Sequence, residues 1–166
     1  MVGFPKSKIN LGLRITGKRD DGYHDIETVF YPVNLCEALE YVINNDKNGK
    51  DILTVTGHDF LGIPEDNLVL KVVRKLRNLF DLPYLKIHLH KAIPAGAGLG
   101  GGSSDAASAL KMVNRHFGLA MSPNDLKEVA LEIGSDCPFF IDSIPSLASG
   151  RGEILEPVSP VRSEAR

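Results

Sequence analysis

Five glycines fall within the seven residues 96–102, and two serines, Ser103 and Ser104, follow them directly. Glycine allows positive φ angles and lets backbone N–H groups come close to an anion. A helix of small residues is predicted to begin at the serines, and a helix N-terminus carries partial positive charge. The segment therefore predicts a phosphate-binding loop. The alternative is a flexible turn without a ligand, although a turn needs only one or two glycines.

Two well-known phosphate loops match this segment poorly. A Walker A loop ends in Gly-Lys-Ser or Gly-Lys-Thr, and no lysine lies among these glycines. A dinucleotide-binding fingerprint can be aligned as Gly96-x-Gly98-x-x-Gly101, but an acidic residue should then end a second parallel strand about 20 residues later. Residues 121–125 read Met-Ser-Pro-Asn-Asp and indicate the start of a helix instead. The sequence thus disfavours a Rossmann-type site.

The elements around the loop are predicted from the period of the apolar residues. Strict alternation over residues 8–15 predicts a half-buried strand that carries Lys8 and Asn10 together on its polar face. Further strands are predicted over 28–33, ending near Pro32, and over 85–89. Strands at 39–43 and 52–56 are expected to form a hairpin through the polar loop 44–50. The apolar face of the first strand would be Ile9, Leu11, Leu13 and Ile15.

Three helices are predicted after the first strands. One covers residues 69–80, with Asp66 or Asn67 as its N-cap, and a second follows the glycine loop and ends at Gly118. A third begins at Ser122, since serine, proline and an acidic residue follow the order of a capped N-terminus. The order of elements indicates an α+β fold, in which the helices pack on one side of a mixed or antiparallel sheet.

The composition is typical of a soluble globular domain and disfavours nucleic-acid-binding, membrane-spanning and disulfide-rich proteins. The chain has 166 residues, of which 43% are hydrophobic and 24% charged, as expected for one soluble globular domain. A formal charge of -2 argues against nucleic acid as the main partner, and no apolar run approaches the ~20 residues that cross a bilayer. Two cysteines are too few for a disulfide scaffold. These features predict a cytoplasmic protein without a membrane partner.

Four segments together resemble one family. They are Pro94-x-x-x-Gly98-Leu99-Gly100 with its serines, residues 8–13, residues 17–24 with 28–30, and residues 133–140. They resemble the GHMP small-molecule kinases in the family's order, and Asp-Gly-Tyr-His at 21–24 resembles the branch that phosphorylates a cytidine-diphosphate sugar alcohol in non-mevalonate isoprenoid biosynthesis. The resemblance implies a GHMP kinase N-terminal domain over residues 1–157, a fold shared with some ribosomal proteins.

The resemblance also implies that a second domain should follow. We expect residues 158–166 to be a tail and the C-terminal GHMP domain to be absent, so that the chain would turn over poorly by itself. Its exposed interdomain face would then favour self-association.

The family pattern implies a role for several residues. Lys8 and Asp136 would be catalytic, and ATP would bind with Mg²⁺ as its counter-ion. The substrate residues implied are Asn10, Tyr23, His24 and Phe30. The ATP-binding residues implied are Pro94, Ala95, Gly96, Ala97, Gly98, Leu99, Gly100, Gly101, Gly102, Ser103 and Ser104, with Asn67 and Lys91 flanking the adenine.

Without the resemblance, simpler interpretations of these residues remain open. Asp136 would be a cap or a surface charge, Lys8 an edge charge and Phe30 a core residue. His88 and His90 could bind a metal, but no third ligand is obvious, so we expect solvent-facing histidines. The whole chain could also be a non-catalytic nucleotide-binding or assembly module on the same fold.

Overall fold

The computed structural model describes residues 1–46, 49–58 and 64–160 of the chain. These residues form two separate sheets and a group of helices between and beside them. The first sheet has the order β1 (Val2–Gly3), β4 (Ala38–Ile43), β6 (Leu85–Lys91), β5 (Ile52–Gly57). The second has the order β2 (Lys6–Lys18), β3 (His24–Cys36), β7 (Ser146–Ser149), β8 (Ile154–Pro157). The helical elements are η1 (Pro64–Asp66), α1 (Leu68–Leu79), α2 (Gly101–Phe117), α3 (Pro123–Ile133) and α4 (Phe139–Asp142).

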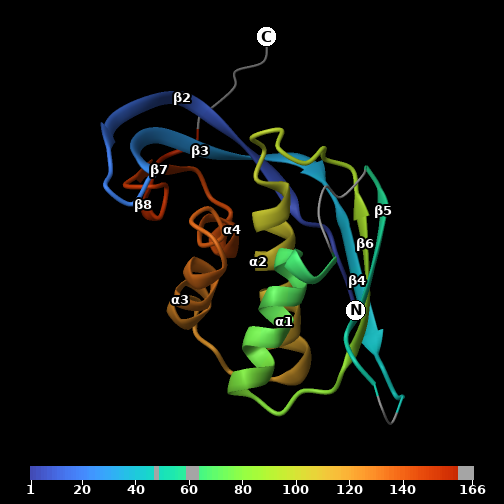
Figure 1. The fold of residues 1–166 in the computed structure, drawn as a ribbon. Coiled ribbons are helices and arrows are strands. Elements are labelled where there is room, and N and C mark those ends of the chain that lie inside the picture. Colours follow the sequence, from blue (N-terminus) through green and yellow to red (C-terminus); the bar gives the residue numbers. More distant parts are fainter. Residues whose placement is uncertain (47–48, 59–63, 161–166) are drawn as a thin grey trace.

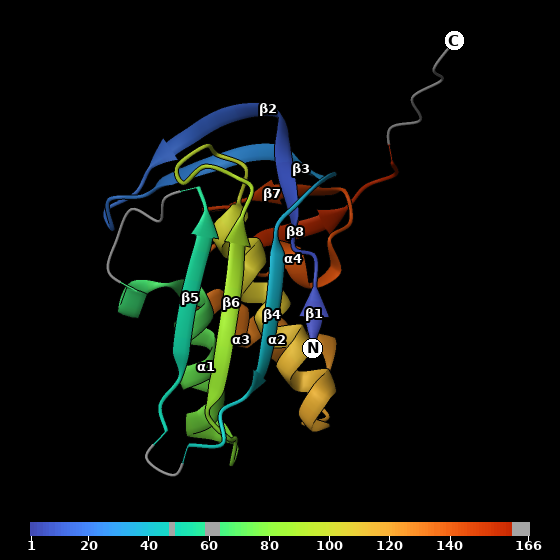
Figure 2. The ribbon, with the colours of Figure 1, turned by 90° about the vertical axis from the view of Figure 1, so that its right-hand side faces the viewer.

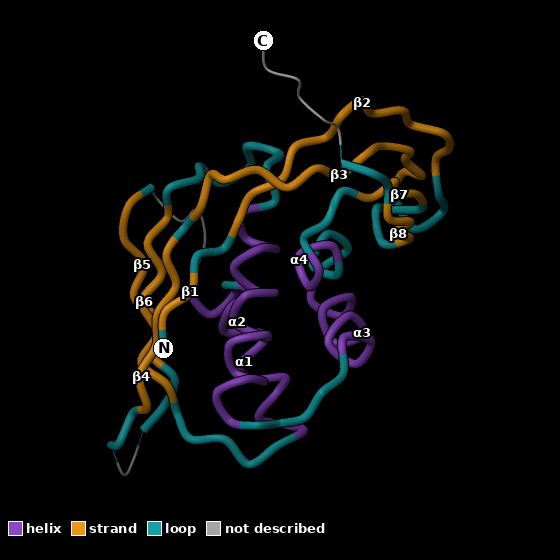
Figure 3. The backbone as a smooth tube through the Cα atoms, turned by 180° about the vertical axis from the view of Figure 1, so that it is seen from behind, coloured by secondary structure: helices purple, strands orange, loops and turns teal. Residues whose placement is uncertain are grey.

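The two sheets cover different parts of the helical layer. Helices α1 and α2 stand between the first sheet and α3, as Figures 1 and 3 show from opposite sides. The long strands β2 and β3 arch across the ends of these helices and carry β7 and β8 at their far end (Figure 1). Figure 2 looks onto the first sheet from its outer face, with the helices behind it. The predicted α+β class is confirmed, but the strands form two sheets where one was expected.

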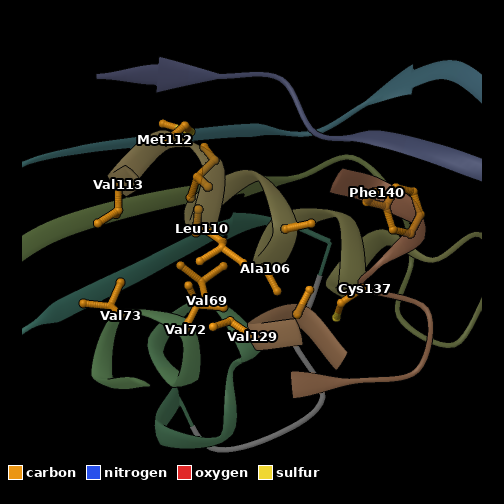
Figure 4. Packing of buried hydrophobic residues seen from close by; sticks show 14 of the residues in the cluster. Val69, Val72, Val73, Ala106, Leu110, Met112, Val113, Val129, Cys137 and Phe140 are labelled. Atoms are coloured by element: carbon orange, nitrogen blue, oxygen red, sulfur yellow. The ribbon is translucent and has the colours of Figure 1, made fainter. Parts of the chain in front are cut away.

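The core lies where α1 and α2 meet. In α1 the buried residues recur at helical spacing, and Val69, Val72 and Val73 point toward α2 (Figure 4). On the facing side of α2 lie Ala106 and Leu110. The small alanine lets the two helices approach closely, and the larger leucine fills the space between them. The apolar stripe of each helix therefore supplies most of the burial that holds it in place.

The helix ends follow the predicted capping residues. The Asn67 side chain accepts a hydrogen bond from the Val69 N–H at 2.9 Å, which makes Asn67 the N-cap of α1. Helix α2 ends at Gly118, which has a φ of 61°. Ser122 and Asp125 form a reciprocal capping box at the start of α3. These three predictions from sequence are confirmed.

Two strand predictions are wrong. Strands β4 and β5 are not a hairpin, because β6 inserts between them and pairs antiparallel with β4 and parallel with β5. Strand β3 also continues through Pro32 to Cys36. In the described structure β7 pairs only with residues 28–30 of β3, so the missing N–H of Pro32 breaks no ladder on that side.

The expected burial of the first strand is also wrong. Leu13 and Ile15 are 61% and 62% exposed, and Leu11 is exposed as well. The register with β3 also shifts between Leu11 and Leu13, so Leu11, opposite Val29, faces the other side of the sheet from Leu13, opposite Thr28. Strict alternation in the sequence shows neither such a shift nor whether another element covers a face. The outer half of β2 extends past the helices, so no described element packs on it (Figure 1).

Candidate phosphate-binding and catalytic site

A cleft of about 340 Å³ lies between the glycine loop and the start of α1. Asp66, Asn67 and Leu68 form one side of it. Residues 94–102 form the other, and Lys91 from β6 with Ser103 and Asp105 from α2 complete the lining. Residues 66–68 and residues 94–105 thus enclose one cleft at the N-terminal ends of α1 and α2.

The beginning of α2 is left open to a ligand. Its N-cap, Gly100, has a φ of 70° and no side chain that could cap the helix. The first N–H groups of a helix have no intrahelical acceptor, and in α2 they lie at the lining of the cleft. An oxyanion placed there would accept hydrogen bonds from them and gain from the helix dipole. Ser104 is buried in the first turn, whereas Ser103 is partly exposed beside the cleft.

Gly100 and Gly101 pack so closely against neighbouring side chains that a Cβ atom would not fit at either position. A Cβ atom at Gly100 would lie 2.7 Å from Phe140 Cζ and 3.3 Å from Lys8 Cε. A Cβ atom at Gly101 would lie 2.9 Å from Glu37 Oε1. The backbone of the loop therefore rests directly on charged side chains that come from other elements. A hydrogen bond of 2.9 Å from the Lys8 N–H to the Leu99 carbonyl also ties the loop to β2.

Lys8 and Asp136 lie together next to this loop. Lys8 Nζ is 3.6 Å from Asp136 Oδ2 and donates a hydrogen bond of 2.6 Å to Asn10 Oδ1. The ammonium also lies 4.5 Å above the centre of the Phe30 ring. Burial lowers the pKa of Lys8, and the neighbouring Asp136 carboxylate partly opposes that shift. The site thus contains a desolvated lysine and a partly exposed carboxylate within direct electrostatic reach.

The remaining predicted substrate residues lie in different surroundings. Phe30 is 1% exposed and packs edge-on against Phe139, so its ring supports Lys8 from within the core. Tyr23 is 55% exposed near the end of the β2–β3 ribbon, and the Arg151 guanidinium lies 5.1 Å from its ring centre. His24 begins β3 and is exposed. One face of Tyr23 is therefore covered by Arg151.

Comparison with known proteins identifies the fold family. The family model described as the GHMP kinases N terminal domain matches residues 67–143, which include the cleft, the glycine loop and Asp136. This part of the chain belongs to the GHMP kinase N-terminal domain family. The glycine loop is thus inside the matched region, and the uncapped N-terminus of α2 opens onto the cleft beside it.

Longer relatives share most of this GHMP kinase chain. A 4-diphosphocytidyl-2-C-methyl-D-erythritol kinase of Bacteroides fragilis is 51% identical over 158 residues, which are 95% of this chain and 58% of that protein. A crystal structure of a 4-(cytidine 5'-diphospho)-2C-methyl-D-erythritol kinase superposes with a TM-score of 0.78 at 32% identity, covering 96% of this chain and 55% of that one. Mevalonate kinase of Methanococcus jannaschii has a TM-score of 0.65 at 14% identity, which shows the shared fold alone. The chain therefore spans somewhat more than half the length of each of these three proteins.

Asn67 and Lys91 line the same cleft of the GHMP kinase domain, but their polar groups already have protein partners. Asn67 caps α1. Lys91 is buried at the end of β6, where its ammonium lies 2.6 Å from Glu37 Oε1 and 2.9 Å from Asp105 Oδ2. Glu37 and Asp105 were not singled out from the sequence. Glu37 is an isolated glutamate between two strands, and nothing in the sequence around it indicates a functional site. Asp105 directly follows the Ser-Ser pair, so an acidic residue in the first two turns of the helix after the glycine loop was the signal that could have identified it.

The two histidines considered as metal ligands, His88 and His90, both contact Thr56. His88 Nε2 and His90 Nδ1 lie 2.9 Å and 3.0 Å from the Thr56 hydroxyl on the outer face of the first sheet. Within the described residues no group of three or more His, Cys, Asp or Glu side chains could hold a metal ion. None of the described helices is long and apolar enough to cross a membrane.

Proposed function

We propose that this chain supplies the nucleotide-binding and catalytic groups of a kinase that transfers the γ-phosphate of ATP to the 2-hydroxyl of 4-diphosphocytidyl-2-C-methyl-D-erythritol. The proximity of Lys8 and Asp136, 3.6 Å apart and tied to the glycine loop through the Leu99 carbonyl, is the observation that carries the proposal. Phosphoryl transfer needs a held phosphate, an oriented hydroxyl and compensation for the charge that develops between them. The cleft, Asp136 and Lys8 correspond to these three needs.

The residues of the loop fit a polyphosphate. The open N-terminus of α2 offers backbone donors, and the glycines leave room for phosphate oxygens beside them. Mg²⁺ would come with ATP as its counter-ion, because magnesium commonly binds substrate phosphates and few protein carboxylates. Bound there, it would neutralise charge on the leaving diphosphate.

Asp136 and Lys8 would act on the acceptor alcohol. The Asp136 carboxylate would accept a hydrogen bond from the 2-hydroxyl and direct its oxygen toward the γ-phosphorus. Lys8 would keep Asp136 ionised and stabilise negative charge on the attacking oxygen. Asn10 orients the Lys8 ammonium through its 2.6 Å hydrogen bond. As the new P–O bond forms, the hydroxyl proton passes to the Asp136 carboxylate, the bond to the β–γ bridging oxygen breaks and ADP leaves.

Tyr23 and His24 would hold the cytidine end of the acceptor. The uncovered face of the Tyr23 ring is available for stacking on a pyrimidine, while Arg151 holds the other face. The relatives named for this kinase activity favour that acceptor over others.

The test uses Asp136→Asn in an intact kinase that carries this domain. ADP release, coupled to a spectroscopic assay, should fall by at least about a hundredfold, while calorimetry shows ATP binding unchanged. Glu132→Gln, which alters only an exposed ion pair with Lys75, is the control and should retain full rate. Turnover of mevalonate or homoserine but not of the cytidine compound would contradict the substrate assignment. ATP binding without turnover of any alcohol would favour a nucleotide-binding module.

A further inference from the structure

Three charged side chains are buried together beneath the glycine loop. Glu37 comes from the junction of β3 and β4 and is 1% exposed, Lys91 ends β6, and Asp105 lies in the second turn of α2. Lys91 Nζ lies between the two carboxyl groups, 2.6 Å from Glu37 Oε1 and 2.9 Å from Asp105 Oδ2. This buried cluster joins both sheets' strands to the helix that follows the phosphate loop.

The cluster has one positive group for two carboxyl groups. Glu37 Oε2 and Asp105 Oδ1 are buried and have no hydrogen-bond partner among the described residues. Buried polar atoms are rarely left unpaired, and two adjacent carboxylates with one ammonium would keep a net negative charge in a dry site. A proton on one of the two carboxyl groups removes that charge and turns one carboxyl oxygen into a donor. The chemistry of the cluster therefore favours one protonated carboxyl group.

The groups around Asp105 agree with this protonation. Burial raises the pKa of Asp105 to about 7, Lys91 opposes the shift, and Glu37 adds to it through its charge and a hydrogen bond. Lys91 from β6 and Glu37 from the β3–β4 junction are the charged groups acting on Asp105 in the described structure. Asp66, which precedes α1, lines the same cleft from its other side.

The cluster is in contact with the place where phosphate would bind. A Cβ atom at Gly101, the first residue of α2, would lie 2.9 Å from Glu37 Oε1 and 3.3 Å from Lys91 Nζ. Lys91 and Asp105 themselves line the cleft. The negative charge of a bound polyphosphate would therefore act at short range on these carboxyl groups, with little water to screen it.

We propose that Glu37, Lys91 and Asp105 are positioning residues of the nucleotide site, and that the cluster takes up a proton from solvent when a polyphosphate binds. The proposal rests on the proposed nucleotide site. Added negative charge stabilises the protonated form of Asp105, and by linkage the protonated form binds the polyphosphate more tightly. Affinity should therefore fall as the pH rises above about 7. If binding moves the pKa of Asp105 by one unit, the change in affinity is about tenfold.

The experiment is calorimetric titration of the chain with AMP-PNP and Mg²⁺ in buffers of different ionisation enthalpy, between about pH 7 and 9. We expect net proton uptake in the wild-type chain and several-fold weaker binding at the upper pH. Asp105→Asn imitates the protonated acid and cannot take up a proton, so it should remove most of the proton uptake and most of the pH dependence of binding. The proton exchange of the nucleotide itself remains as a baseline. Glu132→Gln should behave as wild type. Adenosine, which lacks phosphates, should bind without proton uptake.

The outcomes separate this inference from the proposed function. Binding of AMP-PNP with equal proton uptake in wild type and Asp105→Asn would overturn the proton-coupled cluster and leave the nucleotide site standing. No binding of AMP-PNP by either form would overturn both. Infrared spectra of the unliganded chain near pH 6 provide a check that does not depend on nucleotide. A protonated-carboxyl band should be present in wild type and absent in Asp105→Asn, or in Glu37→Gln if the first variant does not fold. Absence of that band in wild type would refute the protonated carboxyl group.

Discussion

Alanine at Gly100 should destabilise the fold far more than alanine at a neighbouring glycine of the same loop. Gly100 has a φ of 70°, and left-handed backbone costs a non-glycine residue about 1–2 kcal/mol. Its Cβ would also lie 2.7 Å from Phe140 Cζ and 2.9 Å from Phe140 Cε2. Phe140 is buried and its ring packs edge-on against Phe139 at 5.0 Å, so it has little room to move. Overpacking of this kind costs about 1–3 kcal/mol more.

The expected loss for Gly100→Ala is therefore about 2–5 kcal/mol in the free energy of unfolding. Gly98→Ala is the matched control. Its φ is 73°, yet a Cβ atom there would meet nothing within 4 Å, so the loss should be only the backbone cost of about 1–2 kcal/mol. Gly102→Ala, at a helical position with Leu68 Cδ1 3.9 Å away, should be neutral or stabilising by about 0.5–1 kcal/mol.

Urea unfolding followed by circular dichroism measures all three variants against wild type. The order of stability should be Gly102→Ala, then Gly98→Ala, then Gly100→Ala. Equal losses for Gly98→Ala and Gly100→Ala would refute the argument that the loop is pressed against Phe140, because the two positions differ in contacts and hardly in φ.

Four other predictions can be checked with the same chain. Ser122→Ala removes the capping box of α3 and should cost about 1 kcal/mol in urea unfolding, and no change in midpoint would contradict it. Leu13→Thr changes an exposed side chain and should stay within about 0.5 kcal/mol of wild type, whereas a large loss would indicate that Leu13 is buried in solution. The free energy of unfolding of wild type, relative to that of Asp105→Asn, should fall as the pH rises from about 4 toward 7. The reason is that the pKa of Asp105 in the folded state, about 7, lies above the ordinary value of 3.8, so the folded state binds the proton more strongly. A difference that does not change with pH would be inconsistent with this. Burial raises the pKa of Cys137 to about 11, so a thiol reagent near pH 8 should label the partly exposed Cys36 first, and equal labelling rates would contradict the burial.

Local features of this chain could be predicted because their causes are local. The caps at Asn67 and Ser122 and the stop at Gly118 depend on residues within a few positions of one another. The glycine loop and the start of α2 could be predicted for the same reason, since the glycines and the helix that follows them are contiguous in the sequence. The α+β order of elements likewise follows from changes in apolar period.

Other features depend on partners distant in sequence. Strand β6 comes after α1 in the chain, yet it inserts between β4 and β5 and replaces the expected hairpin. Alternation placed Leu13 and Ile15 on one face, but only the extent of the neighbouring helices left that face uncovered. Pairing and coverage are properties of the assembled layers, so a local pattern cannot specify them.

By itself the sequence determined that a glycine loop precedes a small-residue helix and that Lys8 and Asn10 share a strand face. Only the tertiary structure brought Asp136, 128 positions from Lys8 in the numbering, to 3.6 Å from its ammonium. It also buried Glu37, Lys91 and Asp105 together beneath Gly101. The physical reason is that the interaction between two charges depends on their distance in space and on the dielectric around them. Groups that are far apart in the sequence therefore interact strongly once folding buries them side by side.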